Sequence, residues 1–265
     1  MCLAAFHINP EGSFPFVCLA NRDEFHQRAA APLHRWSDHD IVAGKDLQSG
    51  GTWLGINPRG QFGLLTNVRN AALNKGTDAP SRGHLITQYL TGGALPDELQ
   101  SQQYAGFNLI AGELKSDMVA MTYLSNQAGQ GPQTLTPGIH VLSNGALNDM
   151  WPKSEKLAKG LKDLMRSSQL SVDEITRSGL DLLADEATAE DAVLPSTGVP
   201  YAWEKMLSAT KIVSPVYGTR CSTVLVVTSE GVCKLTEVSF GPNGEALGPA
   251  VQLDITLRSP CTDAR

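Results

Sequence analysis

Two apolar segments joined by a tight turn open the chain, and this pair constrains the fold more than any other feature. Residues 2–8 and 14–20 are strand-like and almost wholly apolar, and the turn-forming residues Asn9 to Gly12 separate them. Pro15 lies near the start of the second segment, where a strand tolerates a missing N–H. The pattern predicts an antiparallel β-hairpin, which brings the beginning of its first strand next to the end of its second.

Strand-like and helical segments follow each other along the rest of the chain. Short β-rich runs bounded by turn residues predict strands at 52–57, 61–67, 107–111, 118–124, 139–143, 221–228, 232–240 and 251–257, and none in the polar segment 21–40. Helices are predicted at 83–90 behind a Ser81 cap, at 153–165, after the Ser171–Glu174 capping box, and around 203–207. Because strands stand at both ends, we expect the C-terminal strands to join the N-terminal sheet in one domain over residues 1–265.

Composition and charge argue against several classes of function. The 265 residues carry 21 Lys and Arg against 27 Asp and Glu, a net charge of −6, which offers no basic surface for nucleic acid or an anionic membrane. The longest apolar runs are far shorter than the roughly 20 residues that cross a bilayer. No secretory signal is recognisable, and five cysteines without a Cys-x-x-Cys pair are typical of reduced thiols. We therefore expect a cytoplasmic protein with no transmembrane segment and no nucleic-acid partner.

Cys2 is the residue with the clearest chemical potential. Its small side chain favours aminopeptidase removal of Met1, which leaves a free α-amine and a thiol on one residue. An α-amine has a pKa of about 7.7–8.0 and a thiol one of about 8.5, so the amine can accept the thiol proton near neutral pH. The alternative is an ordinary apolar strand residue, because many cysteines only fill space in a core.

Four polar residues, Asn21 to Glu24, directly follow the predicted second strand of the hairpin. Hairpin pairing places them near Cys2. Arg22 would then favour the thiolate, and Asp23 would hold the ammonium group. The alternative is a solvated loop with an internal ion pair.

Ordered sequence blocks give the chain a resemblance to a known family. The blocks are Met1-Cys2-Leu3, Asn21 to Phe25, Gly50 to Gly55, Thr66-Asn67, Ser81 to Gly83, Gly106 to Leu109, Leu142 to Asn144, Trp151 to Lys153 and Tyr217 to Arg220. Their order and spacing resemble those of the NRDE proteins, also called the transport-and-Golgi-organisation family and named after the tetrapeptide that stands here at residues 21–24.

The resemblance implies a fold and a set of catalytic residues. The implied fold is of the N-terminal-nucleophile (Ntn) hydrolase type, an α+β four-layer αββα sandwich with mostly antiparallel sheets, similar to choloylglycine hydrolases and penicillin acylases. Carried over from that group, the catalytic residues are Cys2, Arg22, Asp23, Asn144 and Arg220. Asn144 would donate to the oxyanion, and Asn67 would be a further polar wall or oxyanion contact. Departures from the family pattern, such as Gly145 after Asn144, affect the expected substrate contacts more than the fold.

The resemblance leaves more than one function open. Members of the family are implicated in intracellular haem trafficking and in lipid or acyl-CoA homeostasis, which implies a carrier of haem or another small amphipathic ligand. Arg22 and Arg220 would pair with haem propionates. The ligand-binding residues would be Asn21, Glu24, Asn67, Trp53 and His7, although a histidine in an apolar strand is more often a core residue. The first alternative is a Cys2-dependent hydrolase of linear amides, or acyl-group handling, and the second is an inactive scaffold. No metal site and no particular oligomeric state are predicted.

Overall fold

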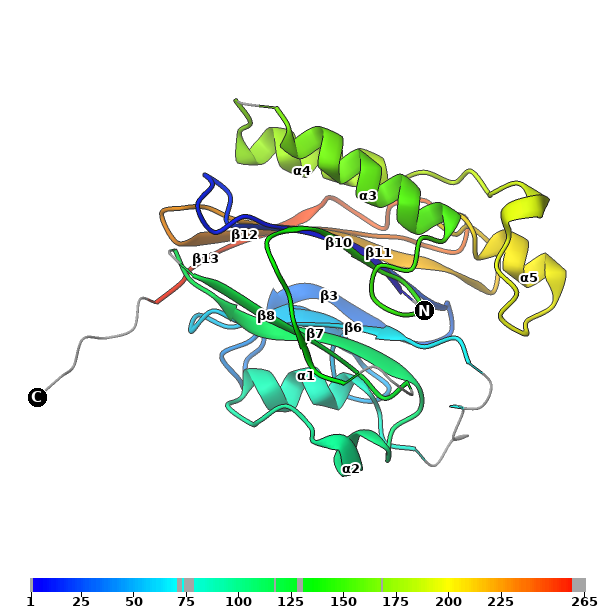
Figure 1. Ribbon diagram of the computed structural model, residues 1–265, viewed down its shortest axis with the longest axis horizontal. Helices are drawn as coiled ribbons and strands as arrows, with labels where there is room; N and C mark the ends of the chain where they lie inside the picture. Colours follow the sequence, from blue (N-terminus) through cyan, green and yellow to red (C-terminus); the bar gives the residue numbers. More distant parts are fainter. Residues whose placement is uncertain are drawn as a thin grey trace, which may run out of the picture.

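Two antiparallel β-sheets packed face to face form the centre of the computed structural model, which describes residues 2–70, 73, 79–116, 118–127, 131–167 and 169–258. Helices cover the outer face of each sheet, so the layers follow the order helix, sheet, sheet, helix (Figure 1). This arrangement confirms the predicted four-layer α+β sandwich.

The first sheet joins the two ends of the chain. Its six strands follow the order β10-β1-β2-β11-β12-β13, and all neighbours are antiparallel. The predicted N-terminal hairpin is present, and the C-terminal strands extend the same sheet as expected. The bounds are β1 Cys2–Ile8, β2 Phe16–Phe25, β10 Gly138–Leu142, β11 Tyr217–Val227, β12 Val232–Ser239 and β13 Val251–Thr256.

The second sheet has seven strands in sequence order, from β3 to β9. Each strand pairs with the next along the chain, so the sheet is an antiparallel meander. The bounds are β3 Ala30–Arg35, β4 Val42–Asp46, β5 Leu54–Ile56, β6 Gln61–Asn67, β7 Phe107–Leu114, β8 Val119–Ser125 and β9 Gln133–Thr134.

Helices form the outer layers. The helices α3 (Pro152–Met165) and α4 (Val172–Leu183) pack on the first sheet, and α1 (Gly83–Leu90) packs on the second (Figure 1). The predicted capping box of α4 is present, since the Glu174 amide donates to Ser171 Oγ at 3.2 Å and the Ser171 amide donates to Glu174 Oε2 at 2.7 Å. The remaining helical elements are α2 (Glu98–Ser101), a 3₁₀ turn (Asp191–Val193) and α5 (Tyr201–Met206).

The alternation of side chains along β1 assigns its residues to two separate cores. Ala4, Phe6 and Ile8 belong to the core between the sheets, whereas Leu3 and Ala5 pack beneath the helices of the first sheet. Successive side chains of a strand point to opposite faces. Cys2 has the same parity as Ala4, so its side chain faces the space between the two sheets.

Three local predictions were wrong. Residues 21–24 lie inside β2, which continues to Phe25, and the polar segment 21–40 contains β3 as well. The residue that precedes α1 is Arg82, whose side chain does not cap the helix, so Ser81 is not the predicted cap. The polar residues at the end of β2 remain in the strand because they pair with β11. Such tertiary pairing overrides a weak local strand propensity.

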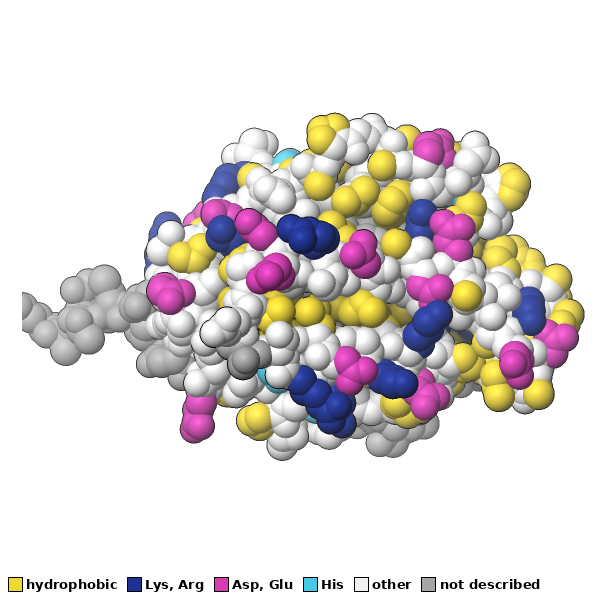
Figure 2. Space-filling model, turned by 90° about the horizontal axis from the view of Figure 1, so that it is seen from above, with side chains coloured by type: hydrophobic (Ala, Val, Ile, Leu, Met, Phe, Trp, Pro, Cys, Tyr) yellow, Lys and Arg dark blue, Asp and Glu magenta, His cyan; other side chains and the backbone are white. Residues whose placement is uncertain are grey.

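Charges of both signs are mixed on the face of the molecule that is seen from above (Figure 2). Lys and Arg side chains alternate with Asp and Glu on the face seen from above, with apolar side chains scattered between them and no large area of one sign (Figure 2). Among the described residues, no helix is long and apolar enough to cross a membrane.

Candidate functional site

The hairpin places Cys2 directly opposite Arg22. The two residues are cross-strand partners of β1 and β2, and Arg22 is also the partner of Cys221 on β11. All three side chains have the parity of the inter-sheet core, so the guanidinium of Arg22 lies between two thiol-bearing strands. The predicted proximity of Arg22 to Cys2 therefore follows from the strand pairing alone.

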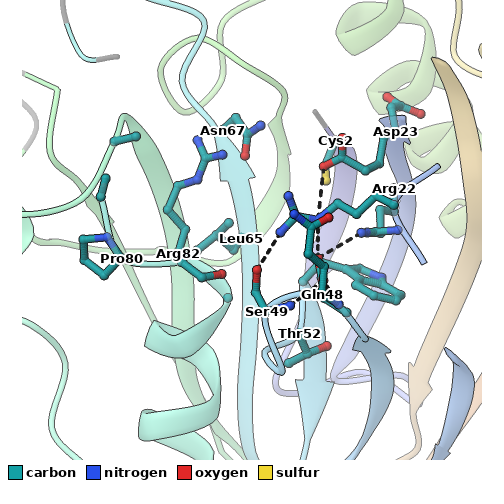
Figure 3. Close-up of a pocket in the computed structure, with 18 residues that line it drawn as sticks. Cys2, Arg22, Asp23, Gln48, Ser49, Thr52, Leu65, Asn67, Pro80 and Arg82 are labelled. Carbon is teal, nitrogen blue, oxygen red and sulfur yellow. Dashed lines mark hydrogen bonds and ion pairs between the residues drawn. The ribbon is translucent and has the colours of Figure 1, made fainter. Parts of the chain in front are cut away.

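A cavity of about 400 Å³ opens beside Cys2 at the edge of the two sheets. Arg22 and Asp23 line it from the first sheet, and Asn67 and Arg82 line it from the side of the second (Figure 3). Most of the lining groups are polar. The predicted site residues in the wall are Cys2, Arg22, Asp23, Glu24, Trp53 and Asn67.

The Arg22 guanidinium is held on two sides. Its Cζ atom lies 4.3 Å from the centroid of the Trp53 ring, a cation–π distance. Its Nη2 donates to Asp46 Oδ2 at 3.3 Å, and Arg28 Nε donates to the same oxygen at 2.6 Å. Asp46, at the end of β4, thus fixes two arginines of the cavity wall.

The acid–base groups near Cys2 are buried, and burial dominates their titration. Burial raises the pKa of the Cys2 thiol, whereas the charge of Arg22 and the backbone N–H of Asp23 act in the opposite direction. Burial also raises the pKa of Asp23, which accepts a hydrogen bond from Thr219 Oγ1 at 2.7 Å. The desolvated thiol is therefore protonated at neutral pH and needs a proton acceptor to become a nucleophile.

Lys153 is a further buried group near this cluster. It lies in the first turn of α3, only 3% exposed, and burial lowers its pKa to about 8 while the charge of Asp23 raises it. Its Nζ has no hydrogen-bond partner among the described residues. A lysine with such a pKa exchanges protons near neutral pH.

Asn67 and Asn144 are neighbours with different surroundings. The Asn144 side chain is fully buried, where its Nδ2 donates to the Asn67 carbonyl at 3.0 Å and its Oδ1 accepts from Arg69 Nη2 at 3.3 Å. Asn67 lines the cavity, and its side-chain amide makes no hydrogen bond to any described residue. Asn67 therefore lines the cavity, whereas the side chain of Asn144 is held by hydrogen bonds behind it.

Arg82 is the cationic group of the opposite wall. Its Nη1 donates to the Gly106 carbonyl at 3.0 Å, and it forms no ion pair with a described carboxylate. Gly83, the residue after Arg82, packs directly against Gly51. A Cβ on Gly51 would lie only 2.5 Å from the Gly83 carbonyl carbon. A guanidinium in a cavity wall without a direct ion pair is suited to bind a carboxylate or phosphate.

Four predicted site residues lie outside this cavity wall, and the buried Asn144 described above is one of them. Arg220 lines a neighbouring cavity, and its Nη1 donates to the carbonyls of Phe25, His26 and Arg28. The Asn21 amide donates to the Leu183 and Thr210 carbonyls beneath the helix layer. His7 has the opposite parity to Cys2 on β1 and therefore points toward the helices.

Sequence reasoning missed several residues of the site. Arg82 and Lys153 lay in recognised sequence blocks, Ser81 to Gly83 and Trp151 to Lys153, to which no role was given. Arg28 and Asp46 belonged to no such block, and the pairing of β3 with β4 that places Asp46 was not predicted. Met1 and Cys261 lie outside the described residues, so the expected removal of Met1 stays a prediction.

Comparison with a solved structure identifies the fold. The chain superposes on the C2A mutant of the conjugated bile acid hydrolase from Clostridium perfringens with a TM-score of 0.54, covering 98% of this chain and 94% of that chain at 6% sequence identity. The two packed antiparallel sheets with their outer helices therefore form an Ntn-hydrolase fold.

Comparison of sequences defines the family. The match to the family described as Transport and Golgi organisation 2 covers residues 1–242. The chain is 34% identical to the human Transport and Golgi organization protein 2 homolog over 91% of this chain and 93% of that protein. It is 32% identical to the mouse homolog over 98% of this chain and 100% of that protein. The chain belongs to the Transport and Golgi organisation 2 family.

Proposed function

We propose that the protein is a Cys2-dependent hydrolase of small linear amides that carry an anionic group. The observation that supports this most directly is the juxtaposition of the Cys2 thiol with Arg22, Asp23 and the Asn67 amide in one polar cavity. Arg82 supplies the affinity for an anionic substituent. The name of the structurally similar bile acid hydrolase fits this class of reaction.

The proposed reaction uses the chain's own groups. After loss of Met1, the Cys2 α-amine accepts the thiol proton as sulfur attacks the amide carbon, and Asp23 stabilises the resulting ammonium. The Asn67 amide donates to the oxyanion. The ammonium returns its proton to the leaving nitrogen as the C–N bond breaks. Water then cleaves the thioester, which releases the carboxylic acid and restores the thiol.

Turnover of N-acyl amino acids tests this proposal. These compounds are linear amides with a carboxylate, and we expect saturable release of the amino acid that Cys2→Ala abolishes. We expect a mass adduct of one acyl group on Cys2 in protein that has lost Met1. Retention of Met1 in the purified native protein, or equal turnover by Cys2→Ala, would contradict the proposal.

The role of Arg82 is tested by a matched pair of variants. Arg82→Gln should lower kcat/KM for the anionic amides about tenfold or more, since a charge-assisted contact is lost. It should leave the turnover of an uncharged analogue unchanged. Arg177→Gln, at an exposed position on α4, should alter neither. Equal loss on charged and uncharged amides would contradict an anion-binding role.

Binding and transfer of haem is the second candidate function. The observation that favours it is that a thiol shares one cavity with Arg22, Arg28 and Arg82, because a thiolate can ligate iron and guanidinium groups pair with propionates. Burial raises the thiol pKa and opposes the thiolate, so we rank haem second. A saturable Soret shift that Cys2→Ala changes would support it. A shift no larger than that given by an unrelated protein of equal charge would contradict it.

A cytoplasmic location and a small-molecule partner are parts of the same proposal. The described cysteines Cys2, Cys18, Cys221 and Cys233 are all free thiols, and free thiols are typical of reducing compartments. The intermingled charges in Figure 2 give no support to a nucleic-acid partner.

A further inference from the structure

A second cavity, of about 370 Å³, lies on the other side of the Arg22–Trp53 pair from Cys2. It shares Arg22 and Trp53 with the first cavity, and Arg220, Cys221 and Glu237 complete its polar side. Its volume lies within the range of about 300–1,000 Å³ that is typical of small-molecule sites. None of the proposed catalytic steps uses it.

Arg22 and Arg220 line this second cavity, and each carries one buried nitrogen without a hydrogen-bond partner among the described residues. These nitrogens are Nη1 of Arg22, whose side chain is 5% exposed, and Nε of Arg220. Arg220 forms no ion pair with a described carboxylate, and its Nη1 is occupied by backbone carbonyls. A buried donor without a partner is costly. The two donors are therefore suited to an acceptor oxygen that a ligand brings.

The acidic residue of the cavity does not supply that oxygen. Glu237 is 2% exposed, and its two oxygens accept from the Leu33 amide at 2.7 Å and from Thr223 Oγ1 at 3.1 Å. Burial raises its pKa, whereas its hydrogen bonds and the charge of Arg22 act in the opposite direction. The cavity wall therefore carries two arginines and one glutamate, so a single anionic group of a ligand would balance its charge.

The rest of the cavity is apolar. Ala30, Ala31 and Pro32 line it from the second sheet, and Leu247, Pro249 and Val251 line it from the C-terminal part of the chain. Leu247 is 63% exposed, so it stands at the rim where a hydrocarbon chain would enter. Burying alkyl groups against this surface is favourable.

We propose that this second cavity binds an apolar monocarboxylate, with the carboxylate between Arg22 and Arg220 and the hydrocarbon chain against residues 247–251. The occupant contacts the guanidinium that faces Cys2, so it also adjusts the electrostatic surroundings of the thiol. The proposal does not depend on amide hydrolysis, since Arg22 is the only charged group that the two sites share and no proposed catalytic step passes through Arg220.

Calorimetric titration of the full chain with octanoate tests the proposal. We expect saturable binding of octanoate, and binding at least about tenfold weaker for octanol, which lacks the charge, and for acetate, which lacks the chain. Arg220→Gln should weaken octanoate at least about tenfold and leave octanol unchanged. The substitution also removes the hydrogen bonds from Arg220 to three backbone carbonyls. Circular dichroism therefore checks that the Arg220→Gln variant is folded.

A rim variant keeps the test independent of Arg220. Leu247→Asp puts a carboxylate at the exposed entrance and should weaken octanoate severalfold. Leu99→Asp, at a still more exposed site on α2, should not. Equal affinity for octanoate and octanol would overturn the proposal. So would equal effects of the two aspartates, or an unchanged octanoate affinity in folded Arg220→Gln. Octanoate binding in Cys2→Ala separates this site from the hydrolytic one, since that variant should bind normally.

Discussion

Asn67 and Asn144 are similar residues for which the proposed function predicts different effects of substitution. Asn67→Ala should lower kcat/KM for the amide substrate by about 10²–10³ and hardly change the free energy of unfolding, because only a cavity donor is lost. Asn144→Ala should lower the free energy of unfolding by about 1–3 kcal/mol, because buried polar groups lose their partner. Turnover assays and urea denaturation of both variants check this. The assignment is wrong if Asn144→Ala loses turnover at unchanged stability.

Lys153 predicts a pH dependence of stability. Its pKa is about 8 in the folded chain against an ordinary value of 10.5. Between these values the unfolded chain holds a proton that the folded chain has released, so the contribution of Lys153 to stability rises with pH. Below pH 8 the buried ammonium opposes folding. Lys153→Met removes this dependence. The free energy of unfolding of the variant, relative to that of the native chain, should therefore fall by an amount on the order of 3 kcal/mol from pH 7 to pH 10.

Urea denaturation at the two pH values measures this difference. Lys159→Met is the matched control, since Lys159 is exposed on the same helix and its replacement should have the same small effect at both pH values. An identical pH profile for Lys153→Met and the native chain would show that the lysine is not desolvated.

At the scale of elements, the close contact between Gly51 and Gly83 places the beginning of α1 against the second sheet. Gly51→Ala should push this segment away and cost about 1–3 kcal/mol of stability, as overpacking does. Affinity for the anionic substrate should fall as well, because Arg82 precedes α1. Gly248→Ala, where a Cβ meets nothing within 4 Å, should not reduce stability. Thermal denaturation and KM measurements distinguish the two variants.

The strands that sequence analysis missed have physical reasons. In β3 only Leu33 is buried, and Pro32 is tolerated because β3 is an edge strand of its sheet. No alternating pattern marks such a strand. Arg220 was expected beside Cys2, but the pairing of β11 with β2 shifts register between Thr219 and Cys221. A bulge redirects a side chain, and nothing in the local sequence indicates one.

At the scale of the whole molecule, the strong local patterns were predictable. The N-terminal hairpin, α3, the capping box of α4 and the joining of the two chain ends in one sheet follow from periodicity and turn residues. The approach of Arg28, Asp46 and Arg82 to the cavity depends on how two sheets and a helix pack, which a single sequence does not encode locally. Cys2 and Arg22 could be paired in advance because one short turn connects their strands.

The shared core predicts one cooperative unfolding transition. Side chains of both sheets form the inter-sheet core, from Phe6 and Leu225 on one sheet to Phe62 and Tyr123 on the other. Neither sheet can unfold without exposing this surface. Far-UV circular dichroism and tryptophan fluorescence should therefore give coincident urea transitions. Two separate transitions would contradict the single-domain prediction for residues 1–265.

The position of residues 21–24 inside β2 limits how this hairpin can change in length. The Asn21 side chain contacts the helix layer, and the side chain of its neighbour Arg22 faces the sulfur of Cys2. One residue added or deleted between Phe16 and Ala20 would therefore turn each of these side chains to the opposite face of the sheet. The amide would then face the thiol and the guanidinium would face the helices. Changes in length are harmless only in the loop at residues 9–15, which lies at the far end of the hairpin from the thiol.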